Sequence, residues 1–409
     1  MQLRDHALRK PLTGIAALTV MAAVTMTMTA AGRAPGLAQS PVRRPPAQMS
    51  AVGGEQLSRP GPQTGPGAPA LPSGLSALSW MVSDGDSDDV LGAQNPHWPL
   101  PPASTLKTLF ADTVLPKIPQ DEVHRVVESD FDGMGEGSSE VGVMPGQTYR
   151  VSDLWLGVFL RSGNDAVHVL AAMNGGVATT VQQMQAEAAS LGAHDTHVVS
   201  PDGYDMPGQV SSAYDLTLFA LHGLKNPVFA KDCSTASSEF PGGPSTKGKP
   251  FEIDNTNRLL TGFDGAGPTY PGLIGVKNGY TTNAGNTVIE AARHDGHTML
   301  VTVMNPQNPE RNEVYKEARE LLDWGFNAEA HGAHPIGTLD AARPASSDTA
   351  AKPSTKSSPA PAWAASANAA GTADTSASYA EATAAAVAVA VGGTLLFARR
   401  RRARRRGNL

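Results

Sequence analysis

The chain has 409 residues, of which 40% are hydrophobic and 17% charged, and its formal net charge is −6 at pH 7. Its 42 Gly and 32 Pro are too many for one uniformly packed fold and too few for a wholly disordered chain, so we expect a globular centre between loose ends. The single cysteine, Cys233, excludes an internal disulfide framework, a cysteine-based zinc site and an iron–sulfur cluster. Between the basic ends, residues 11–398 hold 22 basic and 37 acidic side chains, a net charge of −15 that disfavours nucleic-acid binding.

The first 31 residues have the pattern of a secretory signal peptide. Arg4, Arg9 and Lys10 precede an apolar stretch that runs to Ala31 and ends in small residues. Cleavage after Ala31 and cleavage after Ala38 both fit the pattern, and an uncleaved membrane anchor is the alternative. The sequence therefore predicts export of the rest of the chain.

Two segments rich in small residues and proline flank the expected domain. Residues 32–72 are rich in Pro, Gly and Gln, and residues 327–381 are rich in Ala, Ser, Pro and Thr, with almost no large apolar side chains. Such segments cannot bury enough apolar surface to fold alone, so we expect two flexible linkers. The globular domain is then predicted to span residues 73–326.

The predicted elements of this domain begin and end with strands and are helical between. Apolar alternation and turn residues predict an opening hairpin over 78–82 and 89–94, and three later strands over 273–277, 287–293 and 298–304. Helical spacing predicts helices over 104–115, 152–160, 164–173, 180–191, 212–221 and 312–324. Ser152 is the expected N-cap of the second helix, and Gly192 the expected stop of the fourth. This order favours an α+β fold over alternating βαβ units.

The C-terminal end predicts a membrane anchor. Residues 382–398 form 17 residues without a charge, which is the lower limit for a spanning helix, and seven arginines follow in 399–409. Basic clusters stay on the cytoplasmic side, so we expect a single-pass membrane protein with a basic cytoplasmic tail and an extracellular domain. The alternative, an Ala-rich tail beside a nucleic-acid-binding arm, fits the secretory start less well.

The first motif that could carry chemistry is Ser104-Thr105-Leu106-Lys107, at the start of a predicted helix. Residues i and i+3 share a helix face, so the Lys107 ammonium group can reach the Ser104 hydroxyl. Serine is a weak nucleophile until a base takes its proton, and a buried lysine near a second cation can serve as that base. Taken alone, the motif is common, and a helix cap followed by a solvated lysine is its favoured interpretation.

Two further motifs follow in order along the chain. Ser162-Gly163-Asn164 places a hydroxyl and an amide on one turn, where they could relay a proton and hold a substrate amide. Lys277-Asn278-Gly279-Tyr280 ends a predicted strand, where the lysine could bind a carboxylate and the glycine could let substrate approach the strand edge. An ordinary polar turn and a hairpin turn are the alternative interpretations. Each motif is weak alone, and the ordered set is strong.

The ordered set resembles the motifs of the serine D-alanyl-D-alanine carboxypeptidases, the low-molecular-mass penicillin-binding proteins. The resemblance covers residues 78–326 and is clearest in the sequences of residues 102–107, 160–166, 197–216 and 275–285. It implies a β-lactamase/transpeptidase-like fold, in which an antiparallel sheet is flanked by helices and joined to a helical subdomain. It also implies action on peptidoglycan stem peptides that end in D-Ala-D-Ala, inhibition by β-lactam antibiotics, and no cofactor or metal.

The resemblance implies catalytic roles for residues of the first two motifs. Ser104 would be the nucleophile that is acylated, Lys107 its proton acceptor, and Ser162 a proton relay. Asn164 would bind a substrate amide. Expulsion of the terminal D-Ala would leave an acyl-enzyme that water hydrolyses.

The third motif supplies the implied substrate contacts and one departure from the family. Lys277 would bind the terminal carboxylate, Gly279 would allow close approach, and the N–H groups of Ser104 and Tyr280 would form the oxyanion hole. Asn278 stands where the family usually has Thr or Ser, so a hydroxyl that assists the carboxylate is missing. The resemblance therefore does not predict how Asn278 affects substrate preference or turnover.

Two other functions remain compatible with the sequence. A serine β-lactamase would use the same acylation machinery, but it needs fast deacylation, and the surroundings of Glu187 do not resemble the loop that such enzymes use. A weakly active penicillin-binding or scaffolding homologue is the other alternative, because of Asn278. His194 and His197 have the spacing of a metal pair, but no third ligand is evident and a loop role is favoured.

Overall fold

The computed structural model describes residues 44–340. The predicted signal peptide, the predicted spanning helix at 382–398 and the basic tail lie outside this range. Residues 44–340 contain no helix with both the length and the apolar character needed to cross a bilayer.

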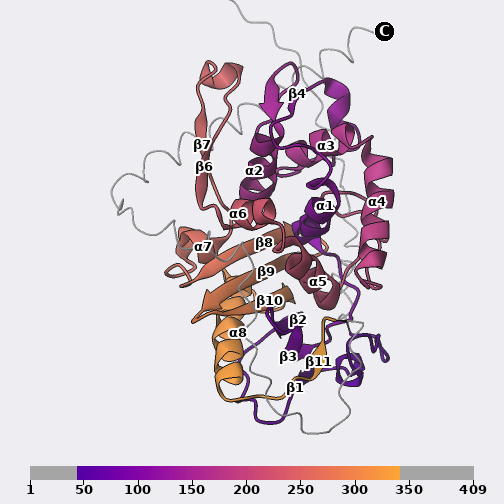
Figure 1. The fold of residues 1–409 in the computed structure, drawn as a ribbon, viewed down its shortest axis with the longest axis vertical. Coiled ribbons are helices and arrows are strands. Elements are labelled where there is room, and N and C mark those ends of the chain that lie inside the picture. Colours follow the sequence, from indigo (N-terminus) through magenta and orange to yellow (C-terminus); the bar gives the residue numbers. More distant parts are fainter. Residues whose placement is uncertain (1–43, 341–409) are drawn as a thin grey trace, which may run out of the picture. The chain divides into compact units, whose positions relative to one another are not determined.

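One large antiparallel sheet and a set of helices make up the described part of the chain (Figure 1). The strands of the large sheet follow the order β1-β3-β2-β10-β9-β8, and β11 pairs with β3. Their bounds are β1 Pro62–Thr64, β2 Ala77–Asp84, β3 Asp89–Gln94, β8 Leu273–Thr281, β9 Gly285–His294, β10 His297–Pro306 and β11 Gly337–Thr338. The helices are α1 Lys107–Val114, α2 Val151–Arg161, α3 Asn164–Met173, α4 Val177–Ser190, α5 Ala213–Gly223, α6 Pro227–Ser234, α7 Arg258–Thr261 and α8 Glu313–Ala330.

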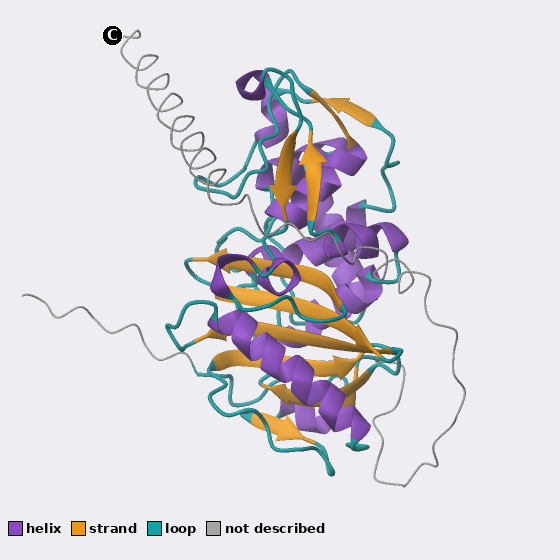
Figure 2. Cartoon of the chain, turned by 90° about the vertical axis from the view of Figure 1, so that its left-hand side faces the viewer, coloured by secondary structure: helices purple, strands orange, loops and turns teal. Residues whose placement is uncertain are grey.

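Two apolar cores lie on the two faces of this sheet. Alternate residues of a strand point to opposite faces. Accordingly, Val301 of β10 packs with Leu321 of α8, while Leu300 joins the core that contains α1 and α5. Figure 2 shows α8 lying across the strands on its face of the sheet. The predicted α+β class, with a sheet flanked by helices, is confirmed.

Helices α1 to α4 form a helical region beside strand β8, the edge strand of the sheet (Figure 1). Two small ribbons belong to this region: β4 (Val123–Arg125) with β5 (Thr148–Arg150), and β6 (Ser237–Phe240) with β7 (Phe251–Asp254). The sequence did not predict these strands, because three or four residues are too few to show alternation. The single-turn helix η2, Ala103–Leu106, lies against β8 and leads into α1.

The predicted domain boundaries at 73 and 326 are too narrow. Strand β1 pairs with β3, and Leu57 is buried, although both lie in the predicted first linker. At the other end, β11 extends the sheet and Leu339 is buried. Main-chain hydrogen bonds hold these segments with few apolar side chains, so their composition resembled that of a linker. The linker interpretation is wrong for residues 49–72 and 327–339.

One of the two predicted helix boundaries is confirmed. Helix α4 ends at Ser190, and Gly192 follows with a left-handed φ of +78°. Ser212, which was not predicted as a cap, is the N-cap of α5, since its side chain accepts a hydrogen bond from the Asp215 N–H. Ser152 does not cap α2, because that helix begins at Val151 and its N-cap is Arg150. The strand predicted to end at Lys277 continues through Thr281, so Asn278-Gly279 is not a hairpin turn.

Candidate active site

Ser104 lies in the single turn η2, whose backbone is held in an unusual conformation. The preceding residue, Ala103, has a left-handed φ of +51°, which is costly for a residue with a Cβ and needs support from its surroundings. Thr287 of β9 donates a hydrogen bond to the Pro102 carbonyl at 3.0 Å. A Cβ added to Gly203 would lie 1.9 Å from the Ala103 carbonyl oxygen, so only glycine fits there. The position of Ser104 is thus fixed by strand β9 and by the segment around Gly203.

Lys107 joins the Ser104 hydroxyl to two other segments. Its Nζ donates to Ser104 Oγ, to Asn164 Oδ1 and to the Asp202 carbonyl oxygen, each at 2.7 Å. The side chain is 1% exposed. Burial lowers the pKa of Lys107 to about 8, although the carboxylates of Asp202 and Asp165 oppose the shift. A lysine with this pKa exists partly as the neutral amine near neutral pH and can then accept a proton.

The groups around Lys107 are themselves held in place. The Asn164 amide nitrogen donates to Ser138 Oγ at 3.0 Å, so both ends of this amide are engaged. Burial alone would raise the pKa of Asp202, but hydrogen bonds from His168, Ser200 and the Tyr204 N–H, together with the Lys107 charge, lower it. The carboxylate of Asp202 therefore stays ionised and fixes the turn that presents its carbonyl to Lys107.

Ser162 ends helix α2 in a left-handed conformation, with φ of +56°. This turn directs the chain from α2 into α3, which begins at Asn164. The Ser162 hydroxyl is buried, and within residues 44–340 no side chain or main-chain group forms a hydrogen bond with it. A buried hydroxyl without a partner costs free energy, and such groups are frequently kept for function.

Strand β8 brings the third motif against the nucleophile. Lys277 is buried, and its Nζ donates to the Asn278 carbonyl at 2.7 Å. Burial and the nearby charge of Lys107 lower the pKa of Lys277 well below its usual value, while Glu290 opposes them. A Cβ on Gly279 would lie 2.6 Å from the Ser104 nitrogen, which shows how closely the strand backbone passes the nucleophile. Tyr280, the next residue, is 68% exposed.

Asn278 is held by groups behind this strand. Its Oδ1 accepts a hydrogen bond from Thr256 Oγ1 at 3.1 Å, and a hydrogen bond with Asn278 lowers the otherwise raised pKa of Tyr315, a residue of α8. The side chain is half-buried. The departure from the family pattern thus has its own local network.

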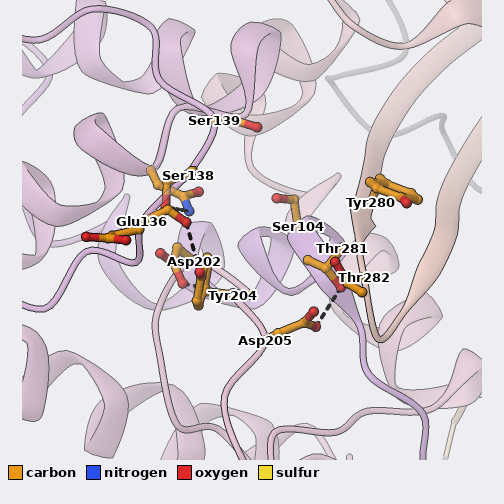
Figure 3. Close-up of a pocket in the computed structure, with 13 residues that line it drawn as sticks. Ser104, Glu136, Ser138, Ser139, Asp202, Tyr204, Asp205, Tyr280, Thr281 and Thr282 are labelled. Atoms are coloured by element: carbon orange, nitrogen blue, oxygen red, sulfur yellow. Dashed lines mark hydrogen bonds between the residues drawn. The ribbon is translucent and has the colours of Figure 1, made fainter. Parts of the chain in front are cut away.

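A cavity of about 230 Å³ lies over Ser104 (Figure 3). Ser104, Asn164 and Tyr280 line it, whereas Lys107, Ser162, Lys277, Asn278 and Gly279 are not among the lining residues. The other lining residues are Glu136, Gly137, Ser138, Ser139, Asp202, Gly203, Tyr204, Asp205, Thr281 and Thr282. Segments 136–139 and 202–205 therefore limit the space for a peptide as much as the three motifs do.

Sequence reasoning missed Asp202 and Ser138. Asp202 lies in the stretch 197–216 that resembles the family, and a glycine after an aspartate indicates a tight turn. A main-chain carbonyl that accepts a hydrogen bond from Lys107 has no side-chain signature in the sequence. The other candidates lie elsewhere. His197 contacts the Gly208 carbonyl, Glu187 lies on α4 and does not line the cavity, and residues 44–340 contain no cluster of three potential metal ligands.

The known proteins that are similar to this chain in sequence share one description. The family model described as D-alanyl-D-alanine carboxypeptidase matches residues 66–308. The D-alanyl-D-alanine carboxypeptidase DacB2 of Mycobacterium tuberculosis is 36% identical over 263 residues, which cover 64% of this chain and 85% of that protein. DacD of Escherichia coli, which carries the same enzyme name, is 31% identical over 62% of this chain and 64% of its own length. The chain thus spans just under two thirds of the latter relative.

Solved structures agree with the sequence relatives. The crystal structure of a D-alanyl-D-alanine carboxypeptidase from M. tuberculosis H37Rv is 34% identical, with a TM-score of 0.60 over 68% of this chain and 99% of that one. The Streptomyces K15 DD-transpeptidase is 25% identical, with a TM-score of 0.57 over 63% of this chain and 100% of that one. The shared fold, and a family match over more than half of the sequence, show that this chain belongs to the D-alanyl-D-alanine carboxypeptidase family.

Proposed function

We propose that this chain is a serine D-alanyl-D-alanine carboxypeptidase that removes the terminal D-Ala from peptidoglycan stem peptides. The observation that carries the proposal is the 2.7 Å contact between Lys107 Nζ and Ser104 Oγ, made by a buried lysine with a lowered pKa. Acyl transfer by serine requires at least a nucleophile in direct contact with a base whose pKa lies near the working pH. Family membership gives the substrate class.

Acylation begins when neutral Lys107 takes the proton of the Ser104 hydroxyl. The oxygen forms a bond to the carbonyl carbon of the penultimate D-Ala, and the negative charge moves to the carbonyl oxygen. The N–H groups of Ser104 and Tyr280 would stabilise that oxyanion, because strand β8 passes close to the Ser104 nitrogen. The peptide C–N bond then breaks, and the leaving amine receives a proton through Ser162, whose hydroxyl has no competing partner within residues 44–340.

Deacylation repeats the chemistry with water as the nucleophile. Lys107 takes a proton from water, the hydroxide attacks the ester carbon, and Ser104 leaves with a proton. Lys277 would hold the terminal carboxylate of the incoming substrate, and Asn164 a substrate amide. A β-lactam would acylate Ser104 in the same way, and we expect that ester to be long-lived.

The proposal extends to location. The basic and apolar N-terminal pattern and the uncharged stretch at 382–398 favour an exported domain anchored by a single C-terminal helix. An extracellular site facing the cell wall would suit a substrate that is part of that wall. Protease added to intact cells should remove the domain and leave a short membrane-bound fragment, whereas full protection would refute this arrangement.

Release of D-Ala tests the activity. The full chain and its Ser104→Ala variant are incubated with a peptide that ends in D-Ala-D-Ala, and free D-Ala is measured. We expect release by the parent and none by the variant. Equal release by both, or no release by a folded parent, would refute the proposed function.

A further inference from the structure

Two consecutive residues connect the opposite walls of the cavity over Ser104. One wall is the segment 136–139, and the other is the end of β8, residues 280–282. Tyr204 and Asp205 lie between them, and we call this pair the crossbar. Figure 3 shows Asp205 joined to Thr281 on one side of Ser104.

Each half of the crossbar is anchored to a different wall. The Tyr204 hydroxyl donates to the Glu136 carbonyl at 2.9 Å, and the ring lies so close to Gly135 that a Cβ there would be within 2.6 Å of it. Asp205 Oδ1 accepts from Thr281 Oγ1 at 2.7 Å, and its Oδ2 accepts from the Asn283 N–H at 2.9 Å. The crossbar therefore ties the helical region to the turn between β8 and β9.

The loop that carries the crossbar is firmly held. Asp202 Oδ1 accepts from the Tyr204 N–H at 3.0 Å, and Gln209 Nε2 donates to the Tyr204 carbonyl at 2.7 Å. Gln209 Oε1 also accepts the N–H groups of Val199 and Ser200. Because Asp202 also provides the carbonyl ligand of Lys107, the crossbar is built on the same turn as the catalytic centre.

The direction of β8 locates the crossbar relative to a bound peptide. In the proposed function, which this inference requires, Lys277 binds the terminal carboxylate and Tyr280 faces the scissile carbonyl. An extended peptide paired with the strand edge would then place its preceding residues beside Thr281 and Thr282. At about 3.3 Å per residue, the crossbar lies one to three residues, or roughly 3–10 Å, beyond Tyr280. It meets the acyl part of the substrate, not the leaving D-Ala.

We propose that the crossbar of Tyr204 and Asp205 determines specificity by limiting the bulk of the residue that precedes D-Ala-D-Ala. A slim residue fits in the cavity between the two walls and leaves the Asp205 contacts intact. A residue whose side chain carries a further peptide branch meets the crossbar and must break the Asp205 contacts to bind. The structure thus favours unbranched over branched stem peptides.

The test compares two peptides on the full chain. Both are acetylated and end in D-Ala-D-Ala; one has L-Ala before this pair, and the other has L-Lys with a dipeptide on its Nε. We measure kcat and KM for D-Ala release. The parent should prefer the slim peptide, and Asp205→Ala should reduce that preference about tenfold, mainly through KM of the branched peptide, since one misfitting group in a pocket changes discrimination by about tenfold or more.

Matched variants separate specificity from general damage. Thr281→Val removes one of the two contacts of Asp205 and should shift the preference in the same direction by less, with no additive effect in the double variant. Asp121→Ala removes an exposed carboxylate outside the cavity and should change nothing. If Asp205→Ala fails to fold, Thr281→Val and Asp205→Asn give the same comparison.

The outcomes distinguish failure of the crossbar proposal from failure of the proposed function. An unchanged preference in folded Asp205 and Thr281 variants, or an equal loss on both peptides, overturns the crossbar proposal and leaves the proposed function standing. A folded parent that releases no D-Ala from either peptide refutes the proposed function, and the crossbar proposal with it. A preference of the parent for the slim peptide that narrows in the Asp205 variants, and less in Thr281→Val, but not in Asp121→Ala supports the crossbar proposal. An active parent without that preference overturns it.

Discussion

The helical region and strand β8 meet at Ser104, and the two sides of this junction, here called the helical wall and the strand wall, are built in different ways. On the helical wall, Ser104, Lys107 and Asn164 are joined by direct hydrogen bonds of 2.7 Å before any substrate arrives. On the strand wall, Lys277 turns its ammonium group to a main-chain carbonyl, and Asn278 bonds to Thr256 behind the strand. The strand wall contacts the nucleophile chiefly through its backbone, at Gly279.

This difference separates chemistry from recognition. The helical wall is a preassembled set of donors and acceptors, so removing one member should abolish the reaction. The strand wall offers a backbone edge and a carboxylate site, so a changed side chain there should alter binding more than the chemical step. A substitution such as Asn at position 278 is then tolerable on the strand wall, whereas its equivalent at Lys107 would not be.

The largest effect is expected from Lys107→Ala, on the helical wall. The variant loses the base that contacts Ser104 Oγ, so acylation by a D-Ala-D-Ala peptide or by penicillin should fall by about 10³-fold or more. Stopped-flow or quenched acylation assays measure this rate. The control is Lys225→Ala, which removes an exposed lysine that does not line the cavity. Substantial acylation without Lys107 would show that another group is the base.

Gly279→Ala, on the strand wall, should have the next largest effect. The added methyl would lie 2.6 Å from the Ser104 nitrogen and 3.0 Å from the Ala103 Cβ, so strand and nucleophile must move apart. A displacement of this size costs about 10²-fold in rate through lost alignment. The assay is kcat/KM for D-Ala release, with thermal unfolding measured in parallel. Unchanged kinetics would mean that β8 does not align the nucleophile.

The pH dependence of acylation should follow Lys107. A group with a pKa of about 8 that acts as a base must lose its proton first, so the rate rises with pH through about 8 and levels off above. Between pH 7 and pH 9 the neutral fraction increases about tenfold, and acylation should increase likewise. A rate that stays flat over this range, or that rises only near the ordinary lysine pKa, would contradict the assigned role.

The smallest effect is expected from Asn278→Thr. The new hydroxyl restores the usual family residue on the strand wall, while Thr256 loses its amide partner. We expect KM for the peptide to fall about two- to fivefold with little change in kcat, because the carboxylate site affects binding of substrate and transition state alike. A large gain in kcat from a nearly silent parent would instead support the weakly active homologue.

The sequence predicted the catalytic groups better than their surroundings. Ser104 and Lys107 share a helix face, and this local spacing was sufficient to predict their contact. Lys277 could be placed only through the resemblance, because 170 residues separate it from Lys107. The fold class followed from the order of strands and helices. The domain boundaries did not, since β1 and β11 are held by main-chain pairing that leaves little trace in composition.

The long-range supports of the site had no sequence signal. Lys107 and Asp202 are 95 residues apart, and their contact uses a carbonyl oxygen that every residue has. Asp205 and Thr281 are 76 residues apart; both lie in stretches that resemble the family but outside the three motifs, so their contact was not predicted. Such contacts depend on how the helical region and the sheet meet, which local periodicity does not encode.

Intact-mass spectrometry of the full chain after exposure to penicillin tests the central claim most directly. A base-activated Ser104 predicts one added penicilloyl group per chain, located on the peptide that contains residue 104, persisting for many minutes and absent from Ser104→Ala. No adduct on the folded protein, or an adduct on a different residue, would contradict the account. Rapid loss of the adduct with turnover of the drug would assign the same serine to a β-lactamase.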